Sequence, residues 1–261
     1  MTNRPELKQK PLIEAIFEVR WALLQPAPDV RIDPHYRLLL GRLYDRILKE
    51  YPIHEPLPTA FLPDDVVPQT VQHRFRRVAD GWPLIQMGPG LMTLNETSAY
   101  SWEDFRERCI QAVATLWDAH PNPEELHIEA LNLRYLNAVE FDHTQESIFT
   151  FLQDRMSVGA GLPEALFQAG NISRRPQGFT SRSTFQCLRP KGRVALQFDT
   201  AFGNKKPILR WETNMISADA DVPATLPAEL QAWINEAHQI IDDCFYALVP
   251  QHLRLPQPQT T

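Results

Sequence analysis

Glycine is scarce in this chain, and none of the glycine-rich loops that bind phosphates is present. The 261 residues include 10 glycines, and neither a GxxxxGKS/T nor a GxGxxG pattern occurs. The HExxH pattern of zinc peptidases and the GxSxG pattern of serine hydrolases are also missing. These absences argue against a P-loop enzyme, a dinucleotide-binding oxidoreductase and the common hydrolases. We therefore expect no cofactor and no bound metal.

The three cysteines, Cys109, Cys187 and Cys244, lie far apart in the sequence. This spacing excludes a disulfide framework and a CxxC metal or redox site. No apolar run approaches the roughly twenty residues that cross a bilayer, and the first residues lack the apolar stretch of a signal peptide. We expect a cytoplasmic protein without a membrane partner, and its 43% hydrophobic residues suffice for a core.

The apolar pattern predicts strands and helices in an α+β order. Residues 12–21 alternate apolar and polar side chains, as a half-buried strand does. An apolar stripe at helical spacing covers residues 230–248, and Ser101 with Asp104 forms a capping box for another helix. The further expected strands are 71–78, 83–87, 91–95, 128–141, 180–188, 193–200 and 208–216, and the further expected helices are 34–49, with Asp33 as N-cap, and 145–156. The proline-rich residues 52–68 and the glycine-containing residues 157–178 are expected to be irregular.

The order strand, helix, strands, helix occurs twice, and short fragments recur in the same order. The matching pairs are 13–16 with 128–131, 19–21 with 133–135, 43–47 with 152–156, 85–87 with 196–198, and 95–97 with 211–213. We predict two repeated halves, residues 1–122 and 123–261, that share one core around a pseudo-two-fold axis. Short connections favour a mostly antiparallel sheet with helices on one face. This arrangement is analogous to that of the TATA-binding protein, an analogy of fold alone.

A sheet that is covered by helices on one face exposes polar side chains on the other. The residues expected on this open face are Arg74, Arg76, Gln86, Asn132, Arg134, Gln197, Arg210, Glu212 and Asn214. Two explanations remain open. The face binds a ligand, or an antiparallel sheet simply keeps one face hydrated.

Basic residues are concentrated in one segment of an otherwise acidic chain. Residues 174–210 contain nine Lys and Arg and a single acid, Asp199, whereas the formal net charge of the whole chain is −6. This asymmetry predicts an anionic partner, unless the charges pair with acidic helices of the same chain. We add Trp211 because its neighbours Arg210 and Glu212 are expected on the open face. The candidate binding residues are Arg74, Arg76, Arg134, Arg174, Arg175, Arg182, Arg189, Lys191, Arg193, Lys205, Lys206, Arg210 and Trp211.

Two further groups have the residue types that chemistry requires. His238 and Asp242 are four residues apart on the expected last helix, where they form an acid–base or metal pair or a plain surface hydrogen bond. Cys187 lies inside the basic segment, where neighbouring cations favour a reactive thiolate. A buried small apolar residue is the simpler interpretation of that cysteine.

Several motifs resemble those of a sporadically distributed, uncharacterised family of prokaryotic proteins of similar length. They are residues 11–21 (PLIEAIFEVRW), 85–95 (IQMGPGLMTLN), 100–105 (YSWEDF), 133–137 (LRYLN) and 242–245 (DDCF). The resemblance covers nearly the whole chain and brings no catalytic residues. The patchy occurrence of the family implies mobile genes of the toxin–antitoxin or phage-defence kind.

The leading hypothesis is a non-enzymatic binding or regulatory protein that docks a protein partner or nucleic acid. It uses the basic segment and the open face. The alternatives are a nuclease or nucleotide-processing enzyme with a site near Arg74, Arg134, Glu212 and Asp242, and a small-ligand sensor with a site between the halves. The sequence leaves the oligomeric state open.

Overall fold

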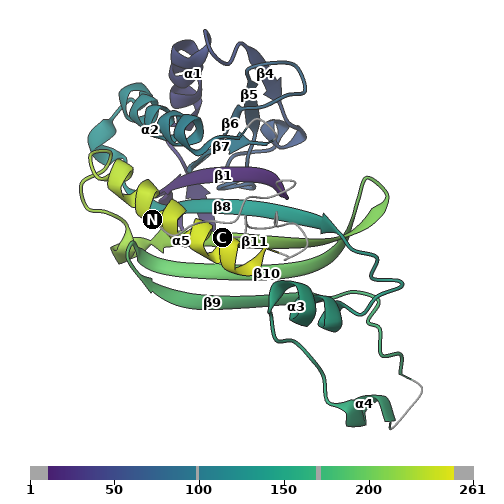
Figure 1. The fold of residues 1–261 in the computed structure, drawn as a ribbon. Helices are drawn as coiled ribbons and strands as arrows, with labels where there is room; N and C mark the ends of the chain where they lie inside the picture. Colours follow the sequence, from purple (N-terminus) through teal and green to yellow (C-terminus); the bar gives the residue numbers. More distant parts are fainter. Residues whose placement is uncertain (1–10, 98–99, 169–171, 250–261) are drawn as a thin grey trace, which may run out of the picture.

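A computed structural model describes residues 11–97, 100–168 and 172–249 of the chain. A nine-stranded sheet runs through the molecule, and helices pack against one of its faces (Figure 1). Every strand pair in the sheet is antiparallel, so the predicted α+β class with an antiparallel sheet is confirmed. No helix of the described ranges is both long and apolar enough to cross a membrane.

The strand order is β4-β5-β6-β7-β1-β8-β11-β10-β9, which places β1 beside β8 at the centre and β4 and β9 at the edges. A separate hairpin, β2-β3, precedes the first helix. The bounds are β1 (Leu12–Trp21), β2 (Leu24–Ala27), β3 (Val30–Ile32), β4 (Ile53–Pro56), β5 (His73–Arg76), β6 (Leu84–Gly88), β7 (Leu91–Glu96), β8 (Ile128–Glu140), β9 (Thr180–Leu188), β10 (Lys191–Gly203) and β11 (Lys206–Ala218).

The longer helices lie over one face of the sheet, and α5 crosses the strands of its second half (Figure 1). Helix α4 sits on an excursion that extends away from the sheet. The described α-helices are α1 (Tyr36–Ile47), α2 (Trp102–Ala119), α3 (Ile148–Met156), α4 (Glu164–Gln168) and α5 (Leu230–Leu248), and short 3₁₀ turns span Pro58–Phe61, Pro123–Glu125 and Asp219–Asp221.

The core lies between these helices and the sheet. Phe17 of β1 and Leu133 of β8 point to the helix side and are fully buried, as period-two alternation requires. They belong to one cluster with Leu39 of α1, Phe105 of α2 and Ile234 of α5. A second cluster joins α3 to the far ends of β8, β10 and β11. Burial of these side chains supplies most of the driving force for folding.

The first helix begins later than the sequence predicts. Its first residue is Tyr36, and Asp33 is not its N-cap. The Asp33 carboxylate accepts a hydrogen bond from the His35 amide at 3.0 Å, at the entry to the helix. It also accepts from Trp21 Nε1 at 2.8 Å and from the Gly90 amide at 3.1 Å. It therefore ties the end of β1 to the β6–β7 turn. The predicted N-cap at Ser101 is confirmed, because Ser101 Oγ accepts from the Asp104 amide, while the Asp104 carboxylate accepts from Arg108.

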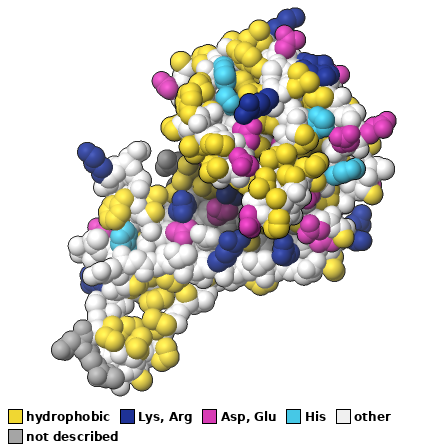
Figure 2. Space-filling view, turned by 180° about the vertical axis from the view of Figure 1, so that it is seen from behind, with side chains coloured by type: hydrophobic (Ala, Val, Ile, Leu, Met, Phe, Trp, Pro, Cys, Tyr) yellow, Lys and Arg dark blue, Asp and Glu magenta, His cyan; other side chains and the backbone are white. Residues whose placement is uncertain are grey.

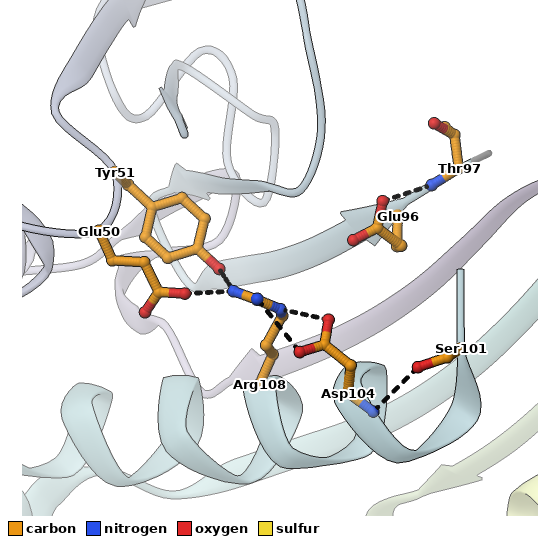
Figure 3. Close-up of polar contacts among 7 residues, drawn as sticks. All are labelled: Glu50, Tyr51, Glu96, Thr97, Ser101, Asp104 and Arg108. Carbon is orange, nitrogen blue, oxygen red and sulfur yellow. Dashed lines mark hydrogen bonds and ion pairs between the residues drawn. The ribbon is translucent and has the colours of Figure 1, made fainter. Parts of the chain in front are cut away.

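Arg108 of α2 joins the helix layer to the segment that follows α1 (Figure 3). Its guanidinium donates to Glu50, to the Tyr51 hydroxyl and, from Nε at 2.8 Å, to Asp104. Tyr51 is itself buried, and burial raises the pKa of its phenol to about 12. The charged group thus satisfies three acceptors at the junction of the two helices.

Two of the recurring sequence fragments lie on opposite faces of the sheet. Ala15 faces the helices, whereas Ala130, its counterpart in the fragment match, faces away from them. Asn95 likewise faces away from the helices, whereas Trp211 is buried against them. These two matches therefore do not align structurally equivalent residues.

Gly192 is a position at which glycine is required for the β10–β11 pairing. Its φ is +145°, and a Cβ there would lie 2.1 Å from the Ile216 carbonyl oxygen. We expect Gly192→Ala to lower the free energy of unfolding by at least about 2 kcal/mol, in the range of strained-backbone substitutions. Urea unfolding measures this. Gly161→Ala is the control, because nothing lies within 4 Å of its Cβ position. Equal stability of both variants contradicts the expectation.

Glu96 makes the stability depend on pH. It ends β7, is buried, and accepts a hydrogen bond from the Thr97 amide at 3.0 Å (Figure 3). Burial raises the pKa of its carboxyl, so the folded state binds this proton more tightly than the unfolded state. The ionised carboxylate therefore costs stability once the pH rises above its ordinary pKa.

We expect Glu96→Gln to be more stable than the parent chain at pH 7.5. The difference should shrink toward pH 4, where Glu96 is protonated in the folded state and increasingly so in the unfolded state. Urea unfolding at both pH values measures the difference. Glu107→Gln removes one charge from an exposed position of α2 and serves as control. A Glu96 variant that is less stable at pH 7.5 shows that the carboxylate is stabilising.

Candidate functional site

The face of the sheet away from the helices carries the polar residues that the sequence predicts there. Strand register aligns them in rows, and Figure 2 shows this side of the molecule, with basic and acidic side chains interspersed across a hollow. One row is Arg74, Gln86, Thr93, Glu18 and Asn132. The next contains Arg76, Asn95, Arg134 and Asn214, and a third pairs Glu212 with Gln197 and Arg182. We call this surface the open face.

On the β5–β1 side of the open face, the polar side chains satisfy one another. Arg74 Nε donates to Gln86 Oε1 at 2.8 Å, and Gln86 Nε2 donates to Asn95 Oδ1 at 3.1 Å. Asn95 Nδ2 donates to Glu14 Oε1 at 2.8 Å. These side chains bond to one another, and a hydrogen-bond network of this kind holds a sheet in one conformation.

Arg76 is held beside this network rather than exposed for binding. Its Nε donates to Glu55 at 2.8 Å, and its guanidinium lies 5.9 Å from the Trp82 ring centroid. The residue as a whole is 9% exposed. Glu55 also lies 3.7 Å from Arg74, and the Arg76 hydrogen bond lowers the pKa of the Glu55 carboxyl. Both arginines therefore already have an anionic neighbour.

On the β8–β11 side, several buried polar atoms have no hydrogen-bond partner within residues 11–97, 100–168 and 172–249. They are Asn132 Oδ1, Arg134 Nε, Arg210 Nε and Asn214 Oδ1. Arg134 lies 3.9 Å from Glu212, and Arg210 lies 3.2 Å from Asp199, so each arginine is still near one acid. Unpaired buried donors and acceptors are rare and costly, and they often mark a place where another molecule completes the bonding.

The edge strand β9 lies at the end of this side of the sheet and is largely exposed. Phe185 is 55% exposed and Leu188 is 81% exposed. The strand is nine residues long, contains no proline and carries one charge, Arg182. The opposite edge, β4, is four residues long and ends in Pro56. Short length and proline protect an edge from pairing, so β9 is the unprotected edge.

The basic segment is divided among distant places. Arg182 and Arg193 lie on the open face of β9 and β10, and neither forms an ion pair with another described residue. Arg189 and Lys191 lie at one end of the β9–β10 hairpin, where Arg189 is 3.4 Å from Glu236 of α5.

Lys205 and Lys206 lie at the opposite end of β10, and Lys206 Nζ is 2.7 Å from Glu140. Arg174 pairs with Glu164 on the α4 excursion, and Arg175 donates to the Thr144 carbonyl at 3.0 Å. The segment is therefore not one continuous patch. Four of its nine basic residues form ion pairs with described residues, and three of these four pair with acids outside the helix layer.

Trp211 does not belong to the binding surface. It is fully buried on the helix side of β11 and stacks against Phe245 of α5 at 6.4 Å between ring centroids. Its neighbours Arg210 and Glu212 do point to the open face, and strand alternation therefore turns Trp211 inward. The sequence prediction for this residue is corrected.

The site suggested for an enzyme is not assembled. Glu212 faces the open side, whereas Asp242 of α5 lines a pocket on the helix side. Cys187 is buried, and its Sγ donates to the Arg189 carbonyl at 3.5 Å. Among residues 11–97, 100–168 and 172–249, no group of three His, Cys, Asp or Glu is arranged to hold a metal ion.

No protein-family model matches this chain, and no curated protein matches it. The resemblance noted from the sequence motifs therefore stays a prediction. The inference about function rests on the open face and on β9.

Asn214 and Asn95 provide a direct test of the unpaired atoms on the open face. Both are buried. Asn214 Oδ1 has no partner among the described residues, whereas Asn95 Oδ1 accepts from Gln86 and its Nδ2 donates to Glu14. We expect Asn95→Leu to lower the free energy of unfolding by about 1–3 kcal/mol and Asn214→Leu to leave it unchanged or raise it. Urea unfolding of both variants measures this. A comparable loss in both shows that Asn214 has a stabilising partner.

Proposed function

We propose that this chain is a non-enzymatic binding protein that docks a protein partner along β9 and the adjoining open face. The partner adds an extended segment to the unprotected edge of the sheet. The observation that carries this proposal is the exposed β9 edge, together with the unpaired polar atoms that β8 and β11 place on the same half of the open face. Strand addition uses the free main-chain groups of such an edge for affinity and the flanking side chains for specificity.

The side chains around β9 specify the chemistry of the added segment. Phe185 and Leu188 offer apolar contacts, while Arg182 and Arg193 are cations without a described ion partner. An extended segment that alternates apolar and acidic residues complements both. A second copy of β9 supplies no acid, because Arg182 is the only charged residue in Thr180–Leu188. Charge complementarity therefore favours a different protein as the partner.

We further propose that residues 1–122 and 123–261 are duplicated halves in a TATA-binding-protein-like arrangement. The element order supports this, since β1-α1-β5-β6-β7-α2 has the counterpart β8-α3-β9-β10-β11-α5. The strand order supports it too, because reading outward from β1 and β8 gives β7 and β11, then β6 and β10, then β5 and β9. The fragment matches are weaker support, since two of the five pair residues on opposite faces.

The resemblance to a family spread with mobile genes suggests where such docking acts. A toxin–antitoxin or phage-defence locus encodes proteins that neutralise or regulate one another through protein contacts. We propose this context for the chain. The partner is then encoded close to it.

The β9 edge is tested by a double substitution, Arg182→Glu with Phe185→Glu. Both side chains are exposed, so the fold should persist. At the edge, a positive charge becomes negative and an apolar ring is replaced by a carboxylate. We expect partner affinity to fall at least tenfold, which corresponds to about 1.4 kcal/mol. The tagged full-length chain is purified from its host at low salt, and native mass spectrometry detects the complex.

The matched control is Lys205→Glu with Phe202→Glu, which changes the same residue types at the β10–β11 turn. Phe202 is 67% exposed, so this pair is equally accessible. Retained binding in the control and lost binding in the β9 variant support the proposal. Equal binding by both variants overturns it. A complex that dissociates on nuclease treatment also overturns it, because that result identifies nucleic acid as the ligand.

A further inference from the structure

A pocket of about 410 Å³ opens on the helix side of the sheet, opposite the open face. It lies between the start of α2, the second half of α5 and the first residues of β1, with β8 as its floor. Its volume falls within the range of about 300–1,000 Å³ that small-molecule sites occupy. The proposed partner surface on β9 does not include any of its residues.

The walls of the pocket are aromatic and held in place. Trp102 stacks on the His238 ring, with 3.6 Å between ring centroids and 10° between ring planes. The Tyr135 hydroxyl lies 2.9 Å from His238 Nδ1 and 2.5 Å from the Tyr100 hydroxyl. This series of side-chain contacts links α2, β8 and α5, so the aromatic surfaces are preorganised. Phe245 completes the apolar wall from α5.

The polar groups of the pocket favour positive charge. Among the residues that the structure describes, its lining includes two carboxyl residues, Glu103 and Asp242, and neither lysine nor arginine. Burial raises the pKa of Tyr100 and Tyr135, so both phenols stay neutral near pH 7. The floor carries Asn137, which is 2% exposed and whose Oδ1 has no hydrogen-bond partner among the described residues. An amide oxygen of this kind accepts hydrogen bonds and needs a donor.

We propose that this pocket binds a small organic cation, a flat apolar body that carries an ammonium or guanidinium group. The aromatic walls contact the body and attract the charge through their ring faces. The ammonium group donates to Asn137 Oδ1, and the exposed Glu103 carboxylate balances its charge. An anion of the same shape meets carboxyl groups and, among the described residues of the lining, no basic residue, so its binding is disfavoured.

Tryptamine and indole-3-acetate test the sign of the charge, because they share an indole body and differ in the charged group. Calorimetry and saturation-transfer NMR on the full-length chain measure both, with agmatine as an aliphatic cation. We expect at least one cation to bind at least tenfold more tightly than indole-3-acetate. The proposal is overturned when neither cation exceeds the anion.

Asn137→Leu tests whether the pocket is the site of binding. We expect it to weaken binding of the preferred cation about tenfold, as loss of one charge-assisted hydrogen bond does. Asn214→Leu makes the same change on the opposite face and should leave cation binding unaltered. Trp102→Leu provides a second variant, with an expected loss of similar size. Unchanged cation binding in both pocket variants, with thermal unfolding showing that they fold, refutes the assignment.

Discussion

The antiparallel pairing of β1 with β8 is the constraint on which the rest of the structure depends. These strands come from sequence regions more than a hundred residues apart, and they pair over most of their length, from Leu12 to Trp21. Each then supports a flank of the sheet, β7 beside β1 and β11 beside β8. Register at this central pair decides which side chains face the helices and which form the open face. A shift by one residue would exchange the two sets.

The same register separates two surfaces of different chemistry. Odd-numbered residues of β8, such as Tyr135 and Asn137, lie under the helices and line the aromatic pocket. Even-numbered residues, such as Asn132 and Arg134, lie on the open face, where β11 and β10 separate them from the β9 edge. One strand thus serves both sides, and a ligand on one side leaves the other accessible. Coupling between the two would have to pass through β8 itself.

Sequence periodicity predicted the strands well, because alternation records burial directly. Residues 12–21 and 180–188 were predicted with the bounds that β1 and β9 have. β4 was missed within a proline-rich stretch, since a four-residue edge strand is defined by its partner and not by a pattern of its own. Asp33 was assigned to a helix cap because local sequence does not reveal its distant partners, Trp21 and Gly90.

The sequence predicted which residues lie on the candidate site, but not where its strands lie in the sheet. The open-face residues followed from alternation, whereas the edge position of β9 depends on strand order, which no local pattern encodes.

The two edges of the sheet also differ in a way that bears on assembly. With β4 short and proline-terminated, strand addition proceeds from one side only. For the proposed docking, the sheet therefore offers one receptive edge and lacks the second that head-to-tail filament growth requires. The proposal thus implies one added strand for each copy of the chain.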